Sequence, residues 1–252
     1  MTNPTLDLIM ARKSVRIFED RPVDDETKDE VLAAALRAPT AGNMMLYSVI
    51  EVEDQAMKDS LAKSCDDQPF IARAPWVLVF VADYQRWMDY FEASGAGRSG
   101  GALARPREGD FLLALDDALI AAQTAVIAAE SLGLGSCYIG DVMERFEEHR
   151  ELLGLPRYAF PAAMLCLGYP TQQQRERPRP PRFDRRHIVF KNRYERRRPE
   201  DFAEMFADPH YAGATLLPGA ANFGQHMYLR KFAAAFSEEM RRSVRRMLEE
   251  WK

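Results

Sequence analysis

The sequence predicts a globular fold in which long helices pack against strands that are buried on both faces. Two continuous apolar runs, residues 76–82 and 161–167, have the length and composition of central strands. Residues 118–129 form a stretch that is apolar nearly all round, which is typical of a helix inside a fold. The chain of 252 residues, with 47% hydrophobic and 29% charged residues, has the ordinary composition of such a protein.

The remaining elements follow from capping and helix-breaking residues. Asp24 is a suitable N-cap, acidic residues crowd the turn after it, and Pro39 cannot continue the helix. Gly133 to Asp141 predicts a glycine-rich turn into a short strand. We expect strands at residues 47–52, 76–82 and 161–167, and helices at residues 4–11, 24–37, 55–63, 84–91, 111–132, 200–206 and 225–251.

Composition argues against several classes of protein. A net charge of −4 gives no global attraction to nucleic acid or to acidic membranes. The three cysteines and four histidines show neither a disulfide framework nor metal-ligand spacing. The apolar run at 118–129 is short and flanked by acids, which argues against a membrane span. Asp7 and Arg12 interrupt any signal-peptide core, so we expect a cytoplasmic protein.

The segment Arg12-Lys13-Ser14-Val15-Arg16 places three cations and a hydroxyl within five residues. Arginine offers a planar fork of donors, lysine a point charge and serine a short hydroxyl donor. This combination is suited to binding an anion. Taken alone, the segment is better explained as a solvated basic face.

Four later segments combine turn residues with hydrogen-bonding side chains. Gly42 permits unusual dihedrals, and Thr40 and Asn43 beside it can hydrogen-bond a planar heterocycle, although an ordinary loop would look the same. The segments are Ala38–Asn43, Ser64–Gln68, Gly133–Asp141, and Pro180–Arg182 followed by Phe190–Tyr194.

In this order and at these distances, the five segments resemble the FMN-dependent nitroreductase family, and within it the larger branch of oxygen-insensitive NAD(P)H nitroreductases and flavin reductases. The resemblance covers about residues 6–194 and, more loosely, the C-terminal helices. It implies an α+β fold with a mixed sheet flanked by helices, built as an intertwined homodimer with FMN at the subunit interface. We expect an FMN-binding core at residues 1–198, with an extended arm from about residue 171, and a helical appendage at residues 199–252.

The resemblance also implies that FMN carries the chemistry, so we expect no catalytic side chain and no metal. Hydride would pass from NADH or NADPH to flavin N5 and then to a nitroaromatic, a quinone or free flavin. For the phosphate the resemblance implies Arg12, Lys13, Ser14 and Arg16, closed by Arg182 or, in its place, Arg179. For the ring and ribityl chain it implies Thr40 and Asn43 of the partner subunit with Gln68, Tyr138, Ile139, Gly140 and Asp141.

Three positions depart from the family pattern. Met45 stands where the family often has glutamine, and Asp141 stands where glycine is common. The loop at residues 212–218 lacks the arginines that grip the 2′-phosphate of NADPH in some relatives, so a preference for NADPH is not supported. Reductive dehalogenation, flavin fragmentation and FMN binding without turnover remain alternatives.

Two polar stretches carry separate hypotheses. Residues 175–198 hold eleven Lys or Arg and three acids, which would suit a nucleic-acid-binding arm, but their prolines and the acidic protein favour an arm that wraps the partner subunit. Residues 94–109 hold five glycines. We interpret this loop as a lid whose arginines meet an anionic substrate group, with a solvated insertion as the alternative.

Overall fold

The computed structural model describes residues 3–97 and 102–251. Its contacts form two compact units, one within residues 1–177 together with 239–252 and the other within residues 178–238. The predicted division into a core at residues 1–198 and an appendage at residues 199–252 stays a prediction.

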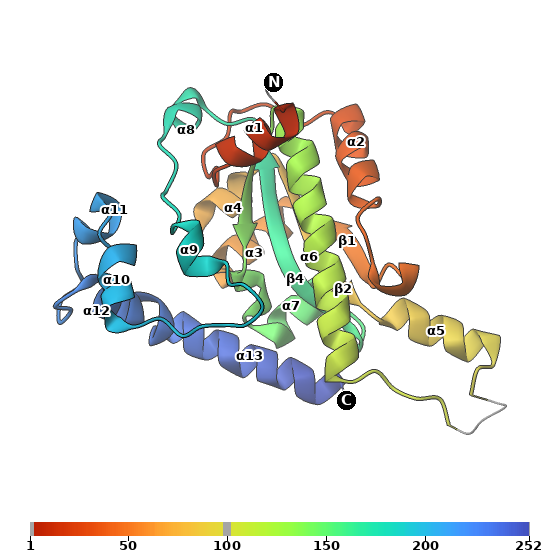
Figure 1. Cartoon of the computed structure of the whole chain (residues 1–252). Coiled ribbons are helices and arrows are strands. Elements are labelled where there is room, and N and C mark those ends of the chain that lie inside the picture. Colours follow the sequence, from red (N-terminus) through yellow and green to blue (C-terminus); the bar gives the residue numbers. More distant parts are fainter. Residues whose placement is uncertain (1–2, 98–101, 252) are drawn as a thin grey trace. The chain divides into compact units, whose positions relative to one another are not determined.

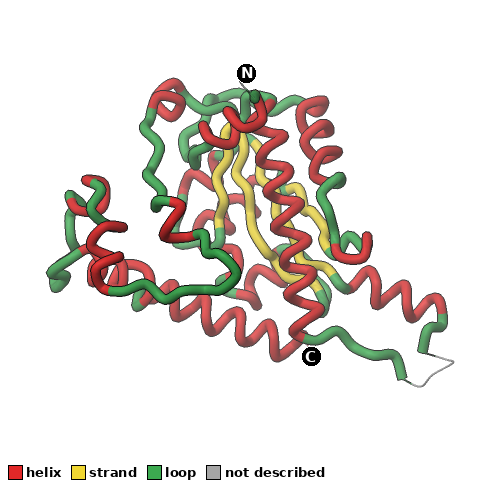
Figure 2. The backbone as a smooth tube through the Cα atoms, in the orientation of Figure 1, coloured by secondary structure: helices red, strands yellow, loops and turns green. Residues whose placement is uncertain are grey.

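An antiparallel sheet with the strand order β1-β2-β4-β3 forms the centre of the first unit (Figure 2). The predicted strands are confirmed to within two residues at each end, and so is the α+β class. Among the described residues, the parallel part of the expected mixed sheet is a single bridge between Ser14 and Ser136. The strands are β1 (Tyr47–Glu51), β2 (Trp76–Asp83), β3 (Gly135–Ile139) and β4 (Ala159–Gly168).

Helices surround this sheet in the first unit, and the second unit also consists of helices and loops. The helices that begin before residue 178 are α1 (Pro4–Ala11), α2 (Asp25–Ala35), η1 (Ala41–Asn43), α3 (Gln55–Ser64), α4 (Pro69–Arg73), α5 (Gln85–Ser94), α6 (Glu108–Ser131), η2 (Asp141–Met143), α7 (Phe146–Leu152) and α8 (Gln172–Glu176). The later ones are α9 (Arg185–Ile188), α10 (Pro199–Met205), α11 (Pro209–Ala212), α12 (Phe223–Met227), the π turn η3 (Tyr228–Phe232) and α13 (Ala235–Trp251).

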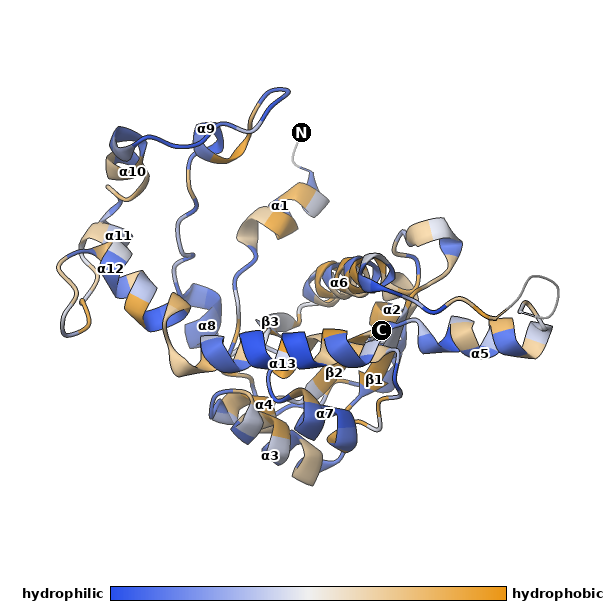
Figure 3. Cartoon of the chain, turned by 90° about the horizontal axis from the view of Figure 1, so that it is seen from below, coloured by the Kyte–Doolittle hydropathy of each residue, from blue (hydrophilic) through white to orange (hydrophobic). Residues whose placement is uncertain are grey.

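Strand β2 is buried along its whole length because helices cover both faces of the sheet. Leu78 and Phe80 pack with residues of α2 and α6. Val77 and Val79 point to the opposite face and pack with α3 and α4. Figure 3 shows the same layering, with α2 and α6 on one side of β1 and β2 and with α3 and α4 on the other. Burial of both faces explains why the strand is apolar at every position rather than at alternate ones.

Helix α6 lies on the sheet and runs along its strands (Figure 1). It packs on the sheet with a face of small side chains. By length and composition alone the whole of this helix, which extends beyond the apolar run at residues 118–129, could cross a membrane. Its packing against the sheet is that of a core helix. The buried alanines are Ala114, Ala118, Ala121, Ala122, Ala125 and Ala129, and the large apolar residues exposed on the helix are Leu112, Leu113, Leu119 and Ile120.

The prediction of one continuous helix at residues 225–251 is wrong. Helix α12 ends at Met227, the π turn η3 follows, and α13 begins only at Ala235. Ala233, with φ −100° and ψ 11°, leaves the helical conformation. The wider π turn shifts the register of the side chains, so the two helices are not one periodic element.

From residue 239 onward, α13 packs on the segment that follows β3. Ser243 Oγ donates to the carbonyl of Met143 at 2.7 Å and accepts the N–H of Phe146 at 2.9 Å. Trp251 is buried, and its ring centroid lies 5.1 Å from that of Phe111 on α6. The end of the chain therefore completes the core of the first unit.

Candidate functional site

The basic segment begins where α1 ends and lies alongside β3. The N–H of Val15 donates to the carbonyl of Ser136 at 2.8 Å. A Cβ added to Gly135 would lie 2.6 Å from Cγ2 of Val15. Glycine at this position therefore lets the segment lie directly against the strand.

Arg12 is held by an acid that α6 supplies. Its Nη1 donates to Ser136 Oγ at 3.3 Å and lies 3.6 Å from Glu130 Oε1, to which Ser136 Oγ donates at 2.7 Å. Burial raises the pKa of Glu130, while the Ser136 hydrogen bond and the charge of Arg12 lower it. One cation of the segment is thus fixed in place by a partly buried pair.

Lys13 and Ser14 contact the start of the arm. Lys13 Nζ donates to the carbonyls of Arg175 and Arg177, and the Arg177 guanidinium donates to the carbonyl of Ser14. The arm therefore brings Arg177 beside the predicted phosphate segment. The sequence did not single out Arg177, because nothing local distinguishes it from the other basic residues of the arm.

Arg12, Arg16 and Arg177 act on one common neighbour, the thiol of Cys137. Burial raises the pKa of this thiol, and the charges of Arg16, Arg12 and Arg177 oppose the rise. The Arg16 guanidinium lies 6.0 Å from the ring centroid of Phe70 and has no salt bridge within the part of the chain that the structure describes. The cluster keeps an excess of positive charge, which fits a phosphate dianion.

Arg182 belongs to the second unit. Its Nη1 donates to the carbonyls of Pro180 and Pro181 in its own loop, at 3.4 and 3.1 Å. The predicted contact of Arg182 or Arg179 with a phosphate therefore stays a prediction.

The Thr40–Leu46 loop is organised by Asp117, a buried carboxylate on α6 that the sequence reasoning missed. Its carboxylate accepts the N–H of Ala41 at 2.9 Å, the N–H of Leu46 at 3.0 Å and the hydroxyl of Thr40. The Thr40 hydroxyl also accepts the N–H of Met45 at 2.8 Å. With its one proton used by Asp117, this hydroxyl can act toward a ligand only as an acceptor.

Backbone strain gathers in the two loops that the sequence singled out. Left-handed backbone suits Asn and Asp but costs free energy at Met45. Two hydrogen bonds hold Met45 in this conformation: its N–H donates to the Thr40 hydroxyl, and its carbonyl accepts from Arg86 Nη1 at 3.1 Å. Strained, over-determined backbone is a feature of binding sites. The non-glycine residues with positive φ in these loops are Asn43, Met45, Asp66 and Asp67, at 58°, 50°, 62° and 47°.

The Ser64–Gln68 loop and the turn after β3 meet at one side-chain pair. Gln68 Nε2 donates to Asp141 Oδ2 at 2.6 Å and to the carbonyl of Cys65 at 2.8 Å. Glu144 follows in the same turn and is buried. Two residues predicted to contact the ring, Gln68 and Asp141, are thus brought together.

Tyr138, Ile139 and Gly140 lie at the end of β3, which is an edge strand of the sheet. The Tyr138 hydroxyl lies 3.4 Å from Gln123 Oε1 on α6, and burial raises the pKa of Tyr138 to about 12. Backbone donors on the outer side of an edge strand do not pair with β4. The stretch can therefore offer N–H groups to a ligand.

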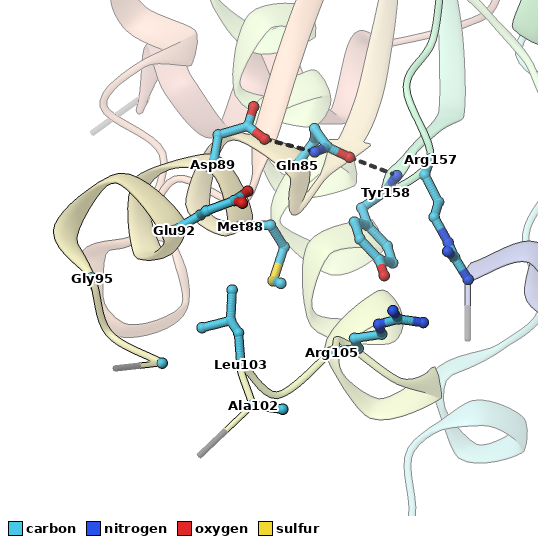
Figure 4. Close-up of a pocket in the computed structure, with 11 residues that line it drawn as sticks. Gln85, Met88, Asp89, Glu92, Gly95, Ala102, Leu103, Arg105, Arg157 and Tyr158 are labelled. Atoms are coloured by element: carbon cyan, nitrogen blue, oxygen red, sulfur yellow. Dashed lines mark hydrogen bonds between the residues drawn. The ribbon is translucent and has the colours of Figure 1, made fainter. Parts of the chain in front are cut away.

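A separate pocket lies beside the described ends of the predicted lid (Figure 4). Asp89 and Glu92 of α5 stand on one side of it and Arg105 and Arg157 on another. Residues 98–101 of the loop lie outside the described residues, so the lid stays a prediction.

The chain matches the model of the Nitroreductase family over residues 9–169. It is 33% identical over 193 residues to an oxygen-insensitive NADPH nitroreductase of Salmonella typhimurium, covering 77% of this chain and 75% of that protein. It is 35% identical over 179 residues to an NAD(P)H-dependent FMN reductase of Bacillus subtilis, covering 71% of this chain and 71% of that protein.

Solved structures agree over nearly the full length. Nitroreductase A from Vibrio parahaemolyticus superposes with a TM-score of 0.83 at 25% identity, covering 100% of this chain and 98% of that one. The NADPH:FMN oxidoreductase from Vibrio harveyi, solved with NAD+, gives a TM-score of 0.79 at 26% identity and covers 98% of both chains.

Replacing Asp117 by alanine should destabilise the protein by about 2–5 kcal/mol, because the donors of Thr40, Ala41 and Leu46 would lose their buried acceptor. Asp117→Asn should recover part of the loss. Urea denaturation measures both, with Asp116→Ala, an exposed neighbour, as the matched control. Equal stabilities of the Asp116 and Asp117 variants would contradict this role.

Glu144 should make the folded protein less stable as pH rises. Burial raises the pKa of Glu144 to about 7, and the charges of Asp141 and Asp66 add to the rise. The folded state thus holds a proton that the unfolded chain releases near pH 4.5. The contribution of Glu144 to stability is therefore full below about pH 4.5 and is lost as pH rises to about 7.

Glu144→Gln lacks this titration. Its unfolding free energy relative to the wild type should rise by about 1–3 kcal/mol between pH 4.5 and pH 8. Urea denaturation across this range measures the difference, and Glu148→Gln, on the exposed side of α7, is the control. A difference that does not change with pH would refute the assignment.

Proposed function

Because the chain belongs to the nitroreductase family, we propose that it is an FMN-dependent oxidoreductase. Bound FMN would take hydride from NADH or NADPH at N5 and deliver it to an acceptor such as a nitroaromatic, a quinone or free flavin. Relatives named as a nitroreductase and as an FMN reductase support this reaction type.

The observation that carries the proposal is the convergence of cations on the basic segment. The charges of Arg12, Arg16 and Arg177 all act on Cys137, and Arg177 also donates to the carbonyl of Ser14. Among the described residues, Glu130 neutralises only Arg12. In the proposed holoenzyme, Lys13, Ser14 and the three arginines hold the phosphate. Their charges keep the dianion bound while the ring region remains free for substrate.

The other site residues would orient the ring. Gln68 and Asp141 would lie at its polar edge, and the end of β3 would offer backbone N–H groups. Thr40 and Asn43 would reach the cofactor from the partner subunit. No step requires a side-chain nucleophile, because the proposed residues bind and orient.

We propose that the protein is a homodimer. The exposed Leu119 and Ile120 of α6 and Leu6 and Met10 of α1 form apolar surface of the kind that subunit interfaces cover. Sedimentation equilibrium should give about twice the 28.7 kDa mass of the chain. A folded, FMN-loaded monomer would contradict this.

The proposal leaves the nucleotide preference open and includes a cytoplasmic location. Residues 199–229 contain no Lys or Arg that could select the 2′-phosphate of NADPH. The three cysteines are free and buried, which suits a reducing compartment. Cell fractionation tests the location.

Anaerobic addition of NADH or NADPH to the FMN-loaded protein should abolish the visible absorption of oxidised flavin. Addition of a nitroaromatic or a quinone should restore it. Unchanged absorption with both nucleotides would refute the reductase and favour a carrier or a flavin-fragmenting enzyme.

Arg16→Ala should weaken FMN binding by about tenfold to a hundredfold, because one charge-assisted contact contributes about 1.5–3 kcal/mol. Arg177→Ala should have a similar effect. Equilibrium dialysis with FMN measures both, and Arg245→Ala, an exposed arginine of α13, is the control. Wild-type affinity in both variants would exclude the phosphate assignment.

A further inference from the structure

The amide of Gln68 has one possible orientation. Its Nε2 is 2.8 Å from the carbonyl of Cys65 and 2.6 Å from Asp141 Oδ2. A carbonyl and a carboxylate only accept hydrogen bonds, so both N–H groups of the amide must face them. Gln68 Oε1, which has no donor within the described part of the chain, is left as an acceptor.

An acceptor in this place selects one atom of a flavin. The polar edge of the isoalloxazine presents two carbonyl oxygens with the N3–H donor between them. Gln68 Oε1 can pair only with the donor, whereas a freely turning amide could equally donate to a carbonyl. The contacts with Asp141 and with the Cys65 carbonyl therefore decide which flavin atom Gln68 can bond.

We propose that Asp141 is a positioning residue that, together with the Cys65 carbonyl, holds Gln68 as the acceptor for flavin N3–H and, through its charge, opposes reduction of the bound FMN. The inference rests on the proposed function, since it requires FMN at this site. Glycine, common at this position in the family, supplies neither the hydrogen bond nor the charge.

The charge of Asp141 acts in a partly buried place. It raises the pKa of Glu144, which is buried and follows in the same turn. The cations of Arg12, Arg16 and Arg177 act instead around Cys137. Reduction adds negative charge to the flavin, so a half-buried carboxylate beside the ring makes the reduced form less favourable.

Asp141→Asn separates the charge from the hydrogen bond, because an asparagine oxygen can still accept from Gln68. We expect its ratio of affinities for reduced and oxidised FMN to rise about tenfold, which for a two-electron couple is about 30 mV in midpoint potential. Equilibration with redox dyes measures this. Asp67→Asn removes an exposed charge one residue from Gln68 and should change the ratio less than about twofold.

A flavin analogue tests the orientation of the amide. N3-methyl FMN lacks the donor, so it should bind the wild type at least about tenfold more weakly than FMN. Gln68→Met keeps the bulk without the acceptor and should show a smaller penalty than the wild type. Asp141→Ala should also show a smaller penalty, because only the Cys65 carbonyl then holds the amide.

The outcomes are distinct. Equal penalties in the wild type and Gln68→Met, or an unchanged affinity ratio in Asp141→Asn, would overturn the inference while FMN binding stands. Failure of the wild type to bind FMN would overturn the proposed function and this inference with it. Circular dichroism tests whether each variant is folded. If a substitution of Asp141 gives an unfolded protein, Asp141→Gly takes its place.

Discussion

The packing of α6 on the sheet is the contact on which the proposed site depends. A row of alanines lets the helix lie directly on the strands, and the same helix supplies a polar side chain to each of three site segments. Asp117 accepts the donors of the Thr40–Leu46 loop, Gln123 meets Tyr138, and Glu130 holds Ser136 and Arg12. A shift of this helix would therefore disturb all three segments together.

The charges of the site are separated in space. The basic segment and Arg177 form a positive region around Cys137, whereas Asp141, which accepts a hydrogen bond from Gln68, lies with Asp66 near Glu144. In the proposed holoenzyme, the phosphate would lie at the first region and the ring would extend toward the second. Affinity and reduction potential would then be set by different residues.

The elements of the fold could largely be predicted from the chain. Strand β2 is apolar at every position because both of its faces are buried, and Asp24 caps α2 as expected. Such local features survive in any context, since burial and capping act within a few residues. The break before α13 was not predicted, because no glycine or proline marks the π turn.

The sequence by itself determined the strands, most helices and the segments that form the candidate site. Only the tertiary structure decided which side chains meet. Arg177 lies 163 positions from Ser14 along the chain, and Asp117 lies 76 positions from Ala41. The pairing of Gln68 with Asp141 spans 73 positions. Local pattern records propensity and burial, whereas such contacts depend on how the strands and α6 bring distant segments together.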